Sequence, residues 1–107
     1  MCGIVGIINN SLYSMAKAGL ILFTKTLALE WARYNIQVNA ICPGYFLTDL
    51  NRDFFQTPAG QKVINKIPMR RLAEPGEIRG VTLLLASDAS SFITGSAIVV
   101  DGGHIAG

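Results

Sequence analysis

Residues 11–19 read Ser-Leu-Tyr-Ser-Met-Ala-Lys-Ala-Gly, and they begin a helical pattern that continues to Tyr34. Apolar residues recur there every three or four positions in two neighbouring stripes, which is the period of an α-helix. A helix with so wide an apolar arc is covered on more than one side, for example by a sheet and by a second helix or subunit. The pattern therefore predicts one long helix over Leu12–Tyr34 inside a layered structure.

The first turns of this helix carry a phenol and an ammonium group four residues apart, at Tyr13 and Lys17. Side chains at positions i and i+4 lie on one face of a helix, about 5–6 Å apart at Cβ. A positive charge at that distance stabilises the phenolate, although burial opposes part of the effect. The pair is suited to exchange a proton with an alcohol or carbonyl oxygen. On spacing alone, a surface pair without a chemical role is the simpler interpretation.

Two β-branched runs farther along, Ile36–Ile41 and Ala97–Val100, predict strands. Between them, Glu74–Glu77 has the proline and acidic residues of a helix start, and the helix is expected to reach Ala86. Two strands joined by a helical crossover are parallel neighbours. Their apolar character is typical of interior strands, which a sheet of two or three strands cannot cover. The sequence therefore predicts an α/β fold in which residues 1–107 form a single partial domain.

The segments between these elements are less regular. Met1–Asn10 is expected to be a short strand or a packed loop, because glycines punctuate its apolar residues. Tyr45–Pro68 contains two short amphipathic stretches, with Thr48-Asp49 expected to cap the first. Long segments of this kind are usually lids or binding loops.

Several single residues carry structural predictions. Asn39 lies inside a predicted strand, so its side chain is expected to bond to backbone groups. Arg70 and Arg71 are expected to be solvated or to form a salt bridge with Glu74 or Glu77, rather than to bind phosphate. His104, near the end of the sequence, is expected to be exposed.

Composition excludes several classes of function. Half of the 107 residues are hydrophobic and the formal charge is +2, which describes one globular unit. Nine basic residues against seven acidic ones give no electrostatic footprint for nucleic acid. The apolar run Gly19–Phe23 is far shorter than the ~20 residues of a membrane span. We therefore expect a cytoplasmic protein with no nucleic-acid or membrane partner.

The metal-binding residue types are scarce. Cys2 and Cys42 are too few for a disulfide framework or a metal site, and both are interpreted as small apolar fillers. With one histidine, the chain cannot supply a multi-histidine zinc site or Ser-His-Asp catalysis unless a second chain contributes. The sequence predicts no metal site.

Four blocks, in order along the chain, together resemble the classical short-chain dehydrogenase/reductase family. They are Tyr13-x-x-x-Lys17, Val38–Gly44 with Thr48 four residues on, Pro68–Ile78 and Ile93–Gly103. The 3-oxoacyl-carrier-protein reductases and the sugar or polyol dehydrogenases of the family are the most similar in character. The resemblance implies the C-terminal half of a Rossmann-like, doubly wound parallel sheet, without its N-terminal nucleotide-binding half.

The resemblance also implies a reaction, the NAD(P)-dependent interconversion of a secondary alcohol and a ketone. Tyr13 would donate and accept the proton, while Lys17 would make the phenol more acidic and bind the nicotinamide ribose. The pocket for NAD or NADP would include Tyr13, Lys17, Pro43, Gly44, Phe46 and Thr48. Alternatives remain for each turn residue: Pro43-Gly44 as a strand end, Phe46 as packing, and Thr48 as a helix cap.

Two features of the family are missing from this sequence. The glycine-rich turn that seats the pyrophosphate is absent. The catalytic serine would fall at or just before Met1, and Ser11 is predicted to cap the helix instead. The sequence therefore resembles a fragment that is inactive alone. The wide apolar arc of the long helix suggests that the intact enzyme is a homodimer or homotetramer. The alternative is a truncated, non-catalytic product or an interaction module that pairs through the Leu12–Tyr34 helix. The small-molecule substrate is left open between a sugar and an acyl chain, as is NAD against NADP.

Overall fold

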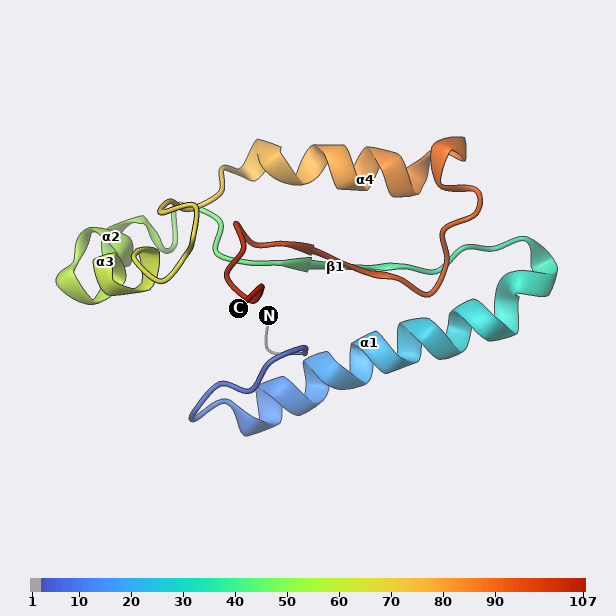
Figure 1. Ribbon diagram of the computed structural model, residues 1–107, viewed down its shortest axis with the longest axis horizontal. Coiled ribbons are helices and arrows are strands. Elements are labelled where there is room, and N and C mark those ends of the chain that lie inside the picture. The colour runs from blue at the N-terminus through green and yellow to red at the C-terminus, as the bar shows by residue number, and fades with distance from the viewer. Residues whose placement is uncertain (1–2) are drawn as a thin grey trace.

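The computed structural model describes residues 3–107. Its elements follow the order helix, strand, helices, strand (Figure 1). They are α1 (Ser11–Trp31) with the 3₁₀ turn η1 (Ala32–Tyr34), β1 (Ala40–Pro43), α2 (Arg52–Gln56), α3 (Pro58–Ile64), η2 (Pro75–Ile78) leading into α4 (Arg79–Ala86), η3 (Asp88–Ser90) and β2 (Ala97–Val100). The predicted α/β order is confirmed.

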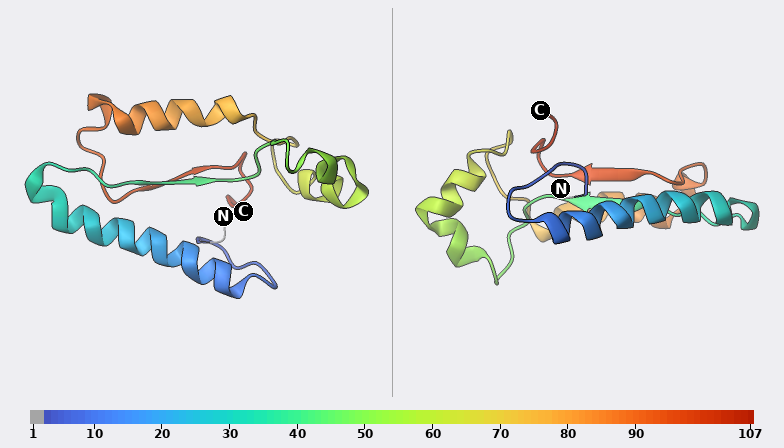
Figure 2. Two further views of the ribbon diagram at one scale, coloured as in Figure 1. Left: turned by 180° about the vertical axis from the view of Figure 1, so that it is seen from behind. Right: turned by 90° about the horizontal axis from the view of Figure 1, so that it is seen from below.

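The two strands form a parallel pair at the centre of the structure. Ala40 pairs with Ala97 and Pro43 with Val100, so the carboxyl ends of both strands lie at the same edge. Helices α1 and α4 lie on opposite sides of the strands, and α2 and α3 project beyond the carboxyl ends (Figures 1 and 2). The arrangement is a helix–sheet–helix sandwich with two strands in the middle layer.

Helix α1 begins with a backbone bond and not with a side-chain cap. The N–H of Ser14 donates to the carbonyl oxygen of Asn10 at 2.7 Å, and Asn10 occupies the cap position without a side-chain cap bond. The prediction that Ser11 caps this helix is wrong, because Ser11 already lies in its first turn. After η1, Asn35 adopts a left-handed conformation with φ of 57°, which asparagine tolerates better than most residues, and the chain turns back toward β1.

Strand β1 lies farther along the chain than predicted. Ile36–Asn39 runs beside the segment before β2, but side chains supply several of its bonds: the N–H of Val38 donates to Oγ1 of Thr94 at 3.0 Å. Asn39 donates to the carbonyl of Ile93 at 2.8 Å and accepts from the N–H of Ser96 at 3.0 Å. These bonds replace a regular ladder and confirm the backbone role predicted for Asn39.

The segment between β1 and η2 folds into two short helices. The expected Thr48-Asp49 cap is wrong, since α2 begins at Arg52 with Asn51 in the cap position. Helix α3 has a true side-chain cap, in which Thr57 accepts a hydrogen bond from the N–H of Gly60 at 3.2 Å. Phe55 of α2 is buried and anchors this pair of helices.

The core of the described residues is thin. The buried apolar residues among residues 3–107 are Ala28, Cys42, Phe55 and Ile67. Cys42 is therefore a buried filler as predicted, whereas Cys2 lies outside the described residues. The radius of gyration is 15.6 Å, against about 13 Å for a compact domain of this length. Much of the apolar arc of α1 is uncovered, with Leu29 83% exposed, which agrees with two strands of a larger sheet.

The lead-in before α1 is a series of turns. Of Met1–Asn10, the structure describes residues 3–10, and it places no strand among them. Gly3 passes close over α1, because a Cβ on it would lie 2.8 Å from the backbone of Lys17. Neither predicted form is found: residues 3–10 form a loop, but most of it is exposed and not packed on a core, with Ile8 88% exposed.

Within residues 3–107, one helical stretch, Ser11–Tyr34, is long and apolar enough to cross a membrane. Its mean hydropathy over an 18-residue window is 1.2. Counting only uninterrupted apolar runs misses this stretch, because Thr24 and Thr26 interrupt the runs. Their hydroxyls donate to carbonyl oxygens one turn earlier in the helix. Length and composition are weak evidence, since core helices of soluble proteins pass the same test. The expectation of no membrane partner stays a prediction.

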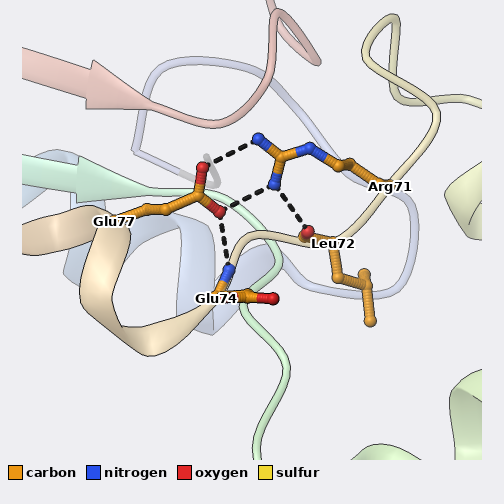
Figure 3. Close-up of polar contacts among 4 residues, drawn as sticks. All are labelled: Arg71, Leu72, Glu74 and Glu77. Carbon is orange, nitrogen blue, oxygen red and sulfur yellow. Dashed lines mark hydrogen bonds and ion pairs between the residues drawn. The ribbon is translucent and has the colours of Figure 1, made fainter.

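The start of η2 is fixed by an ion pair (Figure 3). Arg71 donates to both carboxylate oxygens of Glu77 at 2.7 Å, and the N–H of Glu74 donates to Oε2 of Glu77 at 2.8 Å. The hydrogen bonds from Arg71 and from the Glu74 backbone lower the pKa of Glu77 to about 2. The predicted salt bridge is confirmed for Arg71, while Arg70 donates to the carbonyl of Asn65 instead.

Candidate functional site

Tyr13 and Lys17 lie together on the first turns of α1, as their spacing predicts. The Nζ atom of Lys17 is 5.3 Å from the centroid of the Tyr13 ring, which is within the range of a cation–π contact. Tyr13 is 54% exposed, so much of this residue is open to solvent. The pair therefore offers a phenol and a positive charge on one accessible face.

This face borders a cavity of about 370 Å³ between α1 and β1, here called the α1 cavity. Tyr13 and Lys17 line one side of it, and Pro43 and Gly44 line the other. Ligands of open α/β sheets bind outside the carboxyl ends of the strands, and Pro43 is the last residue of β1. Four of the six predicted site residues thus meet at the expected edge of the sheet.

Phe46 and Thr48 line a different cavity of about 610 Å³, here called the α4 cavity. It lies between the segment after β1 and the start of η2, where Pro75 contributes to its wall. Pro43 and Gly44 line both cavities, so the two groups of predicted residues share one wall. The structure does not bring Phe46 or Thr48 into the α1 cavity with Tyr13.

Gly44 has a structural reason to be glycine. Its N–H donates to the carbonyl of Val100 at 2.9 Å. A Cβ on Gly44 would lie 2.6 Å from Cβ and 2.7 Å from Cα of Asp101, which is closer than real contacts allow. The close approach of the chain after β1 to the chain after β2 therefore requires glycine here, whatever ligand binds.

The turn after Gly44 is held by backbone hydrogen bonds. The N–H of Leu47 donates to the carbonyl of Ala73 at 2.8 Å, and the N–H of Ala73 donates to the carbonyl of Tyr45 at 3.0 Å. The carbonyl of Thr48 accepts from the N–H of Asn51 at 3.2 Å. The hydroxyl of Thr48 makes no hydrogen bond within residues 3–107, so it is available to a ligand.

Sequence reasoning missed Tyr45, which lines both cavities. Its ring packs edge-to-face on Phe55 of α2 at 5.9 Å and on His104 at 5.6 Å between centroids. His104 is therefore half-buried, and the prediction that it is exposed is wrong, because the end of the chain folds back onto Tyr45. The available signal was the position of Tyr45 between two residues already assigned to the pocket.

Asn51 was also missed. It is half-buried, lines the α4 cavity, and bonds to both Phe46 and Thr48. Asparagine three residues from a turn residue is a signal for a side-chain-to-backbone turn bond.

Among residues 3–107, no group of three His, Cys, Asp or Glu side chains is placed to hold a metal ion.

Comparison with known proteins identifies the family. The family model described as enoyl-(acyl carrier protein) reductase matches residues 1–104. The ribulose-forming D-arabinitol 2-dehydrogenase of Candida tropicalis is 51% identical over 96 residues, covering 87% of this chain and 34% of that enzyme. The acetoacetyl-CoA reductase of Shinella zoogloeoides is 49% identical over 92 residues, covering 86% of this chain and 38% of that enzyme.

A solved structure gives the same result for the fold. The gluconate 5-dehydrogenase of Burkholderia cenocepacia J2315, in complex with NADP and tartrate, superposes with a TM-score of 0.90 at 33% identity. The match covers 99% of this chain and 42% of that one. The chain thus spans little more than a third of the curated relatives cited here. The family resemblance predicted from the four sequence blocks is confirmed: the chain belongs to the short-chain dehydrogenase/reductase family and corresponds to its C-terminal region.

Proposed function

We propose that the chain carries the proton-transfer site and the substrate lid of an NAD(P)-dependent oxidoreductase that interconverts a secondary alcohol and a ketone. The oxidoreductase lineage follows from the family. The observation that carries the finer proposal is the α1 cavity, where Tyr13 and Lys17 face Pro43 and Gly44 at the carboxyl ends of parallel strands.

In this proposal Tyr13 is the catalytic acid and base. Its hydroxyl gives a proton to the carbonyl oxygen during reduction and takes one from the alcohol during oxidation. The resulting phenolate is stabilised by the Lys17 ammonium, which lies over the same ring. When bound, the nicotinamide dinucleotide supplies or accepts the hydride.

The residues present fit one end of that cofactor. Lys17 offers an ammonium donor and Thr48 a free hydroxyl, on either side of Pro43-Gly44, which suits the ribose and carboxamide of a nicotinamide riboside. For the pyrophosphate, residues 3–107 contain no glycine-rich turn at a helix N-terminus, since α1 follows Asn9-Asn10. These 107 residues alone are therefore proposed to bind NAD or NADP weakly and to be inactive without a nucleotide-binding half.

The relatives suggest a small polar alcohol or ketone as substrate. One is named for a polyol, another for an acetoacetyl thioester, and the solved structure contains tartrate. The lid of α2 and α3 fits either class, because it carries the exposed charges of Arg52, Asp53 and Lys62 as well as the exposed Phe54. Residues 1–107 are proposed to be one partial domain of a cytoplasmic homodimer or homotetramer, with no nucleic-acid or membrane partner.

A second candidate rests on the uncovered arc of α1. Leu12, Met15 and Leu29 are each more than two-thirds exposed, so the helix is suited to pair with another polypeptide. A non-catalytic interaction module would use this arc without needing Tyr13 or Lys17. The two candidates therefore differ in whether a conservative change at Tyr13 has any effect.

The test uses a full-length enzyme that contains a dinucleotide-binding half. This half comes from the natural polypeptide where it encodes one, and otherwise from the D-arabinitol 2-dehydrogenase of Candida tropicalis, joined before residue 1. Tyr13→Phe removes only the hydroxyl. We expect kcat for polyol oxidation, or for reduction of a 3-oxoacyl thioester, to fall by about a hundredfold or more. The Kd for NADPH or NADH, measured by fluorescence titration, should stay within about twofold because the ring remains.

Tyr34→Phe is the matched control, because Tyr34 is an exposed tyrosine in η1, the 3₁₀ turn that follows the other end of α1. It should leave kcat unchanged. A Tyr13→Phe variant that keeps most of its rate would remove Tyr13 from the mechanism. A full-length enzyme that binds the dinucleotide yet converts neither class of substrate would contradict the proposed reaction.

A further inference from the structure

Asn51 holds the turn after β1 with both atoms of its amide. The backbone N–H of Thr48 donates to Oδ1 of Asn51 at 2.8 Å, and Nδ2 of Asn51 donates to the carbonyl of Phe46 at 2.8 Å. The amide thus spans the turn from one end to the other and fixes the distance between Phe46 and Thr48.

This use of the amide is not explained by helix capping. Asn51 occupies the cap position of α2, where an asparagine side chain normally accepts from the second or third N–H of the helix. Here no such bond forms, and the side chain points back to the turn instead. Helix α2 therefore begins without help from the Asn51 side chain.

The Asn51 amide serves both bonds with two separate atoms. The N–H of Thr48 needs an acceptor and the carbonyl of Phe46 needs a donor, and an amide supplies one of each. A carboxylate would keep the acceptor but would place a second oxygen against the Phe46 carbonyl. An alanine would leave the N–H of Thr48 and the carbonyl of Phe46 without these partners.

We propose that Asn51 is a positioning residue, which orients the Phe46–Thr48 turn toward the nicotinamide end of the dinucleotide. This rests on the proposed function, in which Lys17 and Thr48, on either side of Pro43-Gly44, bind the nicotinamide riboside. Asn51 acts through the turn: its own amide is already engaged, while the hydroxyl of Thr48 is free. Its effect is therefore on dinucleotide affinity, and not on the proton transfer by Tyr13.

The experiment titrates NADPH and NADH into the full-length enzyme and its variants. Asn51→Ala is expected to raise the Kd of the preferred dinucleotide about tenfold, with kcat at saturating dinucleotide within about twofold. Asn51→Asp, which keeps the acceptor for Thr48, is expected to raise it about threefold. Asn65→Ala is the matched control, because Asn65 is an exposed asparagine after α3, outside both cavities.

Hydrogen exchange separates positioning from general stability. In Asn51→Ala the amide of Thr48 should exchange faster while the amides of β2 keep their protection. Thr48→Val, in parallel, reports whether the turn contacts the cofactor at all. If Thr48→Val weakens binding and both Asn51 variants leave Kd unchanged, the role of Asn51 is refuted and the proposed function stands. If none of the three changes Kd, the cofactor contact of the turn is refuted, and the role of Asn51 with it.

Discussion

Two walls of the candidate site, the Tyr13–Lys17 face of α1 and the Phe46–Thr48 turn, are built in different ways. Tyr13 and Lys17 meet because a helix places positions i and i+4 side by side, and nothing else in residues 3–107 bonds their side chains. The turn depends on the distant Ala73 and on the amide of Asn51. One wall needs only secondary structure, while the other needs a folded chain.

The difference predicts where substitutions act. Changes at the exposed Tyr13–Lys17 face should alter the chemistry and leave the fold intact. Changes at the turn and its supports should act through packing, stability and cofactor binding. Each of the following experiments sets one wall against the other, and they run from the largest expected effect to the smallest.

Lys17→Met gives the largest effect of the three. It keeps a long apolar side chain on the exposed helix face but removes the charge that stabilises the phenolate of Tyr13. We expect kcat of the full-length enzyme to fall by about a hundredfold, with the melting temperature unchanged within error. Steady-state kinetics and thermal unfolding measure the two effects separately.

Lys25→Met is the control, since Lys25 is an exposed lysine two turns farther along the same helix. It should change neither quantity. A Lys17→Met enzyme with more than about half of the normal kcat would show that the charge has no role in proton transfer.

Gly44→Ala should distort the Pro43-Gly44 backbone, which lines both cavities. The new Cβ would lie 2.6 Å from Cβ of Asp101, and backbone atoms must move to relieve the clash. We expect the free energy of unfolding to fall by about 2 kcal/mol in urea denaturation, because overpacking of this kind forces backbone shifts. Affinity for the dinucleotide should fall as well, since Pro43-Gly44 lines both cavities.

Gly80→Ala is its matched control. Gly80 lies in α4, and a Cβ added to it would meet no atom within 4 Å. Alanine should therefore stabilise the helix by about 0.5–1 kcal/mol. If Gly44→Ala proved as stable as the parent, the close approach to Asp101 would not be what requires glycine there.

The sequence was informative where helical periodicity, β-branched runs and polar turns decide the structure. Strand Ala97–Val100 and the end of α4 at Ala86 lie where they were predicted, since β-branched residues and polar turns mark them. Tyr13 and Lys17 meet because helical periodicity is local. The parallel pairing also followed, because a helical crossover between two strands leaves few alternatives.

The wrong helix caps at Ser11 and Thr48-Asp49 are local errors of one to three residues. The other errors arose where a distant partner decides the outcome. β1 starts at Ala40 because Thr94 and the side chain of Asn39 take the bonds of the preceding residues. His104 is half-buried because Tyr45 lies beside it, and neither residue signals the other in sequence. The division of the six site residues between two cavities could not be predicted from the sequence either. It arises because the chain after Gly44 turns toward Ala73, with which Phe46 pairs.

The smallest effect tests how far the support of the turn extends. Arg71 and Glu77 flank Ala73, whose backbone holds the turn, and the pKa of Glu77 is lowered to about 2 mainly by the hydrogen bond from Arg71. A carboxyl with a lowered pKa stabilises the folded state above its unfolded pKa near 4.5, and the effect is lost as the pH falls toward 2. Glu77→Gln should therefore melt below the parent at neutral pH. The difference between the two melting temperatures should shrink between pH 4.5 and pH 2.

Because the pair is exposed to solvent, we expect this difference to be small and to decrease in high salt. Glu30→Gln changes the same charge on α1, where Glu30 makes no ion pair within residues 3–107, so its melting difference should not vary with pH in this way. A Glu77→Gln melting temperature parallel to that of the parent from pH 7 to pH 2 would contradict the assignment. It would leave the backbone bonds of Ala73 and the Asn51 amide as the supports of the turn.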